Sequence, residues 1–106
     1  MTIHDHARVA AIRNEAMIEI NDAVDAYDRK RMHHARYVES GEFRLAYHFR
    51  MQADHHENEA RYQANRLWRV GMRATSNEIL RDLRDIRRTH DCLLKEVKRR
   101  LRRAAK

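Results

Sequence analysis

The chain has 106 residues, a formal net charge of +7, no proline and two glycines. This length allows a single domain, and no apolar run is long enough for a transmembrane helix or a signal peptide. A glycine-rich phosphate loop and a serine nucleophile elbow are both missing, which argues against an enzyme and against a bound cofactor. The single cysteine, Cys92, rules out an intrachain disulfide. We therefore expect a soluble, cytoplasmic, non-enzymatic protein.

The absence of proline and the positions of the two glycines predict an all-α fold of three long helices, at about residues 2–39, 42–70 and 76–104. Gly41 and Gly71 are the expected left-handed ends of the first two helices. Loops this short predict antiparallel neighbours, in an up-down-up helical bundle. Leu, Ile, Val and Phe supply only 20 of the 106 residues, which predicts a thin core. Self-association or a partner is expected to complete that core.

In the first predicted helix, Thr2 is a candidate N-cap and one face is mostly apolar. The residues of that face are Val9, Ala16, Met17, Ile20, Val24, Tyr27, His34 and Val38. Arg13 and Arg31 interrupt the face, and we expect these arginines to extend from its edge into water.

The second predicted helix has an inward line and a large apolar outer side. The inward residues are Leu45, Ala46, Phe49, Ala53, His56, Ala60, Leu67 and Val70. The outer side carries Phe43, Tyr47 and Met51, with Trp68 further along. Large apolar side chains in water usually mark an interface, so these four residues are a candidate protein-binding surface. The alternative is that the first helix covers more of the second helix than its apolar face suggests.

The third predicted helix combines an apolar stripe with a basic ridge. Thr75 and Glu78 resemble a capping box at its start. The apolar stripe consists of Ile79, Leu83, Ile86, Leu93, Leu94, Val97, Leu101 and Ala104. The candidate binding residues on or beside the ridge are Arg84, Arg88, Lys95, Lys98, Arg99, Arg102, Arg103 and Lys106. Asp91 is the only acid on the ridge.

The basic ridge predicts an acidic partner, because residues 75–106 carry 11 basic and 5 acidic groups, a net charge of +6. Helically spaced cations can follow the phosphates of a nucleic acid. No sequence-reading motif accompanies them, so contacts would be mainly to the backbone. An acidic protein surface is the alternative, and a merely solvated face is the third interpretation. A membrane surface is disfavoured, because the opposite face of the helix is needed for the core.

Two of the eight histidines, His56 and His90, lie on apolar stripes. Counting residues outward from each turn brings these two to similar levels, near Asp22 and Asp25. Together with Glu59 they are weak candidates for a metal site. The preferred interpretation is a buried polar layer that fixes the register, or histidines hydrogen-bonded to carboxylates.

Two functions remain open from the sequence. The first is a binding protein that places its third helix on nucleic acid or on a nucleoprotein machine. The second is a protein–protein inhibitor, adaptor or assembly factor that docks on an acidic surface. In size and charge, the chain is similar to the small accessory proteins that bacteriophages and mobile elements encode.

Overall fold

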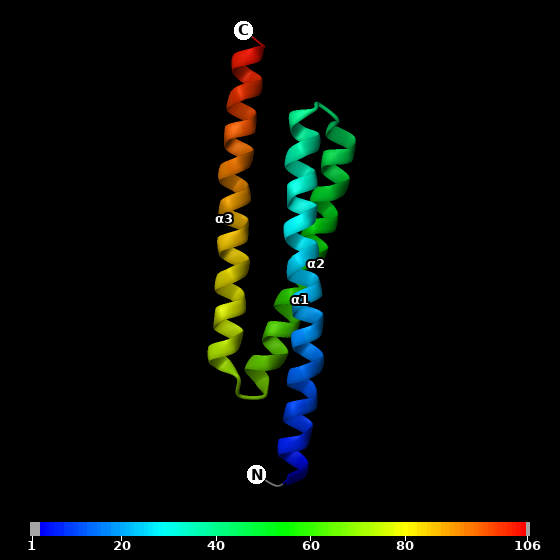
Figure 1. Ribbon diagram of the computed structural model, residues 1–106, viewed down its shortest axis with the longest axis vertical. Coiled ribbons are helices and arrows are strands. Elements are labelled where there is room, and N and C mark those ends of the chain that lie inside the picture. The colour runs from blue at the N-terminus through cyan, green and yellow to red at the C-terminus, as the bar shows by residue number, and fades with distance from the viewer. Residues whose placement is uncertain (1–2, 106) are drawn as a thin grey trace.

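The computed structural model describes residues 3–105, which form three α-helices. They are α1 (Ile3–Glu39), α2 (Phe43–Arg69) and α3 (Arg73–Ala104). The chain rises along α1, returns along α2 and rises again along α3, in a particle that extends 68 × 21 × 14 Å (Figure 1). The prediction of an all-α chain with three long helices is confirmed. Within residues 3–105, no helix is long and apolar enough to cross a lipid bilayer.

Both helix-ending glycines adopt the left-handed conformation that the sequence predicted, with φ of 80° at Gly41 and 90° at Gly71. At the first turn, the Glu42 N–H donates to the Tyr37 carbonyl at 2.9 Å. At the second turn, the Met72 N–H donates to the Leu67 carbonyl at 2.9 Å. These bonds define two Schellman endings, which satisfy carbonyls that the helix leaves unpaired. Thr2, the candidate N-cap of α1, lies outside the described residues.

The predicted capping box at Thr75 is wrong. Helix α3 begins at Arg73, its N-cap is Met72, and no side chain caps it. The Schellman turn at Gly71 explains the earlier start, because it leads the backbone directly into α3. Met72 packs against the core at this point, and Ser76 is fully buried one turn later. Packing therefore decides where this helix begins.

The main apolar cluster joins all three helices in the half of the molecule near Gly71. Its buried members are Ala16, Ile20, Ala23, Tyr27, Ala53, Ala60, Ala64, Leu67, Ile79 and Leu83. Eight of the fifteen buried apolar residues of the described chain are alanines, which confirms that the core is thin. Alanine allows α1 and α2 to pack closely, but it buries little apolar surface per residue.

A small apolar cluster lies nearer the C-terminal end of α3. Val38, Ala46 and Val97 are buried in it, and Tyr37, Leu94 and Leu101 pack against them. Helix α2 crosses α1 and, at this level, lies on the far side of α1 from α3 (Figure 1). The C-terminal half of α3 therefore lies nearer to α1 than to α2.

Three residues that the sequence predicts to lie in the core are exposed instead. Leu45 is 42% exposed and Leu93 is 43% exposed, although both were predicted to face inward. Ala104 is exposed as well, because α3 extends beyond the α1–α2 turn (Figure 1). Arg31 differs from its prediction in the opposite sense. It was expected to extend into water from the edge of the apolar face, but it is buried and only 2% exposed.

Candidate functional site

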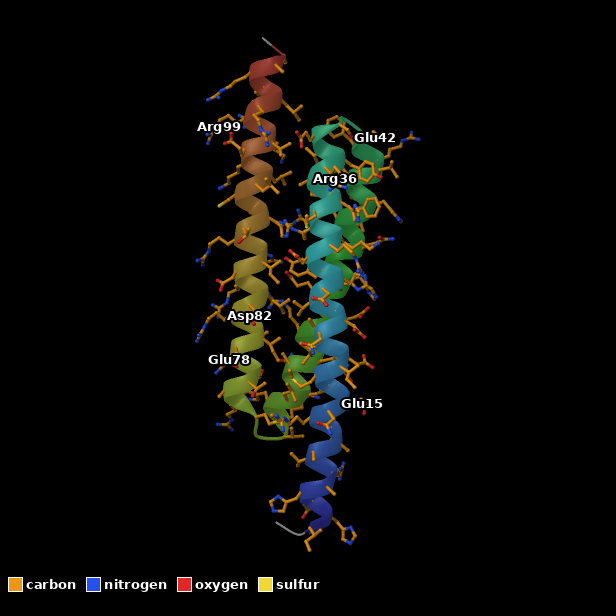
Figure 2. The ribbon with its side chains drawn as sticks, viewed as in Figure 1. Glu15, Arg36, Glu42, Glu78, Asp82 and Arg99 are labelled. Carbon is orange, nitrogen blue, oxygen red and sulfur yellow. The ribbon has the colours of Figure 1, made fainter. Side chains whose placement is uncertain are left out.

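The basic ridge lies on the side of α3 that faces away from the other two helices. Figure 2 shows nitrogen-tipped side chains, including that of Arg99, projecting from that side. We define the ridge by its described members, all of which are exposed: Arg84, Arg88, Lys95, Lys98, Arg99, Arg102 and Arg103. Lys106, which the sequence placed with them, lies outside the described residues.

Asp91, which lies among the ridge cations, is paired with a residue of α1. Asp91 accepts a hydrogen bond from the buried Arg31 at 2.5 Å, so its charge is compensated by α1. Arg99 pairs with Glu96 at 3.0 Å. In the part of the chain that the structure describes, Arg84, Arg88 and Lys95 form no ion pair. These cations are therefore free to meet an external anion.

A buried carboxylate links all three helices beneath the ridge. Glu57 of α2, which is 5% exposed, accepts a hydrogen bond from Arg87 of α3 at 2.6 Å. Arg61 approaches the same oxygen at 3.6 Å. Burial, together with the Glu57 carboxylate, raises the pKa of Tyr27 on α1 to about 12. The same carboxylate raises the pKa of Arg87. Glu57 therefore stabilises the protonated forms of both neighbours.

Helices α1 and α3 are joined at the same level by two further polar contacts. His90 Nε2 lies 2.6 Å from Asp28 Oδ1, and Arg31 is paired with Asp91. We call the whole set the polar layer: Tyr27, Asp28, Arg31, Glu57, Arg87, His90 and Asp91. It borders the main apolar cluster, to which Tyr27 also belongs, on the side towards the small cluster. Because each buried charge requires its own partner, this layer favours a single register for α3.

The predicted meeting of His56 with His90 does not occur. His90 contacts Asp28 instead, while His56 Nδ1 lies 3.8 Å from Glu59 on its own helix. The residue count between α2 and α3 was nearly correct, because Glu57 meets Arg87. The rotation of α2 was wrong by one residue, which amounts to about 100° on a helix. Among residues 3–105, no group of three or more metal-ligating side chains could hold a metal ion.

The candidate protein-binding surface lies on the outer side of α2. Phe43, Tyr47, Met51 and Trp68 are between 43% and 66% exposed. Tyr62, which the sequence analysis missed, is exposed on the same helix, eleven residues after Met51 and therefore on the same side. We call these five residues the aromatic face. At its end, the Arg73 guanidinium lies over the Trp68 ring, 5.1 Å from its centre.

The chain matches no protein-family model, no curated protein and no solved structure. Its function therefore has to be inferred from the basic ridge, the polar layer and the aromatic face.

Proposed function

We propose that this protein is a small, non-enzymatic binding protein that lays the basic ridge of α3 along the phosphate backbone of a nucleic acid. The observation that carries the proposal is the set of exposed cations on one side of α3, whose only acid is bound by Arg31. From Arg84 to Arg103 the helix rises about 29 Å. That is roughly the axial length of eight nucleotides in one strand of duplex DNA.

The geometry favours contact with the backbone over reading of bases. The ridge combines mainly arginine with some lysine, and guanidinium groups can bind phosphate in a bidentate manner. Each phosphate that is neutralised releases condensed counterions, so affinity depends strongly on salt. The projecting end of α3 gives a nucleic acid access without a steric block from α1 or α2 (Figure 1).

The proposal is tested by reversing Arg88, Lys95, Arg99 and Arg102 to glutamate. We expect helicity by circular dichroism to remain, because these side chains are exposed. Binding to duplex DNA or RNA should fall at least 100-fold, because attraction becomes repulsion. For the unchanged protein on duplex DNA, log affinity should fall against log salt with a slope of about −6 if all seven cations bind phosphates.

The matched control changes acids instead of bases. Asp85→Lys with Glu96→Lys should bind as tightly as the unchanged protein or more tightly, since both acids lie outside the ridge. A fourfold ridge variant that keeps full affinity would disprove the proposal.

A second candidate is a protein–protein inhibitor, adaptor or assembly factor of the phage or mobile-element type. The exposed aromatic face favours it, because monomeric proteins rarely leave such side chains together in water. In this case the basic ridge would dock on an acidic protein surface. The protein would then purify free of nucleic acid, and its partner would be lost on Phe43→Ala with Tyr47→Ala.

The proposal includes a cytoplasmic location and a bundle of antiparallel neighbours that a second copy or a partner completes. The side-chain contacts support the antiparallel order. Gln63 donates to Glu19 at 3.3 Å, and Arg66 lies 3.6 Å from Glu15, so later residues of α2 meet earlier residues of α1.

A further inference from the structure

The molecule leaves more surface in water than a compact protein of its size. Its accessible surface is 7702 Å², whereas about 6,300 Å² is typical for a folded chain of 12.8 kDa. Its radius of gyration is 17.7 Å, against about 13 Å for a compact domain of this length. The difference reflects an elongated shape in which α3 is covered on one side only. The surface beside α3 is therefore the place to look for a missing neighbour.

Two recesses between α1 and α3 lie along that surface. The recess near the Gly71 turn has an apolar floor of Met17, Val24 and Ile79. Towards the other end, Met32, Leu93 and Val97 line the second recess. Ile79 and Leu93 are fourteen residues apart, close to four helical turns, so both recesses lie on the same side of α3. We call this surface the α1–α3 groove.

The α3 wall of this groove has a seven-residue repeat. Ile79, Ile86 and Leu93 recur at that interval, and Arg100 takes the next position. Such a repeat is the seam by which one helix packs on another. Ile79 is buried and Ile86 is half-buried, but Leu93 is 43% exposed. The three-helix fold therefore uses the start of this seam and leaves its end uncovered.

The charges along the groove differ between its two ends. Asp25, Glu78 and Asp82 line the recess near Gly71, and no basic residue lines it. Figure 2 shows Glu78 and Asp82 on the N-terminal half of α3. Arg36 and Glu39 line the recess at the other end, where the Arg100 guanidinium lies 3.9 Å from the Glu39 carboxylate. The acidic recess near Gly71 is therefore complementary in charge to Arg36 and Arg100 at the other end.

We propose that a second copy of this chain occupies the α1–α3 groove, running in the opposite direction about a two-fold axis near Thr89. This axis sets Leu93 of one copy beside Ile86 of the other. It also sets Arg100 of one copy between Glu78 and Asp82 of the other. A two-fold contact forms every such pair twice, so the groove complements itself.

The size of the groove suits a dimer. From Ile79 to Arg100, α3 rises about 32 Å, and a face two helices wide measures about 20 Å. Roughly 640 Å² per copy would be covered, near the 800 Å² or so that each partner contributes to a stable complex. The basic ridge lies on another side of α3 and stays exposed. The dimer therefore does not depend on nucleic-acid binding by the ridge.

The first test measures mass in solution by sedimentation equilibrium. The full chain should have about twice its 12.8 kDa mass, and Leu93→Lys should raise the dimer dissociation constant at least ten-fold with unchanged helicity. The matched control Tyr47→Lys, on the aromatic face, should leave the dimer intact. A monomer at all concentrations, or a dimer that responds to Tyr47→Lys and not to Leu93→Lys, would overturn the proposal.

The second test concerns direction. Asp82→Arg and Arg100→Asp should each weaken the dimer, because each sets like charges together across the groove. The two changes in one chain should restore it, since the pair is re-formed with its signs exchanged. A combined variant no tighter than the single variants would rule out the antiparallel arrangement.

Discussion

The two halves of α3 are held to the rest of the molecule in different ways. In the N-terminal half, Ile79 and Leu83 enter the main apolar cluster, which contains side chains from both α1 and α2. In the C-terminal half, α2 has crossed away and Val97 packs in the small cluster. The polar layer lies at the boundary between the halves. Apolar packing thus secures one half, while paired charges and one small cluster secure the other.

The cations of the basic ridge are divided unequally between these two halves. Five of the seven ridge cations belong to the less supported half: Lys95, Lys98, Arg99, Arg102 and Arg103. Segments with few buried contacts open locally at lower free energy than core segments. A ligand that binds the ridge would therefore stabilise the half of α3 that the fold holds least firmly.

The largest expected effect separates the two halves directly. Leu83→Ala should lower the free energy of unfolding by about 3–4 kcal/mol, because Leu83 is fully buried and a cavity would remain. Leu93→Ala should cost less than about 1 kcal/mol, since Leu93 is partly in water. Urea denaturation of both variants, at concentrations that keep the chain monomeric, gives the comparison. Equal losses would mean that both halves of α3 are packed alike.

The second effect concerns the polar layer. Asp91→Ala should lower the free energy of unfolding by about 2 kcal/mol, because the buried Arg31 guanidinium loses its charged hydrogen-bond partner. Arg31→Met in the same chain should recover most of that loss, since no unpaired charge then remains. The pair forms a double-mutant cycle, read by thermal unfolding. Strictly additive losses would show that the two side chains do not support each other.

The smallest expected effect is a pH dependence near the small cluster. Burial lowers the pKa of His34, and the positive charges of Arg50, Arg31 and Lys98 lower it further, against a hydrogen bond to the Ala46 carbonyl. The unfolded chain therefore binds a proton more readily than the folded chain. Stability should fall as the pH drops below about 6.5, and hold above it.

His34→Gln is the control for this effect, because glutamine cannot titrate. The melting temperature of that variant should change less between pH 7 and pH 5 than that of the unchanged protein. Parallel curves would assign the acid sensitivity to other groups.

The sequence predicted those features that depend on one helix or one residue. Gly41 and Gly71 ended helices as expected, because few other residues tolerate a positive φ. The basic ridge followed from helical spacing alone. Features that depend on how helices cross could not be predicted. The exposure of Leu45 and Leu93 arises because α2 leaves α3 halfway along the molecule.

The polar layer shows the same limit at the candidate site. Arg31 was recognised as an interruption of an apolar face, but its partner Asp91 is 60 positions away in sequence. Similarly, Glu57 occupies the place expected for His56, because the residue count fixed the height of α2 and not its rotation. A charged residue on an apolar stripe, as at Arg31, was the available signal for such a layer.

The contact between Arg73 and Trp68 gives the molecule an intrinsic optical probe. Trp68 is the only tryptophan, and it lies at the end of α2 with the Arg73 guanidinium from the start of α3 over its ring. Indole fluorescence responds to the cation and to water at the ring. The emission spectrum therefore reports on the turn between α2 and α3, and α3 can be followed as it moves without attaching a label.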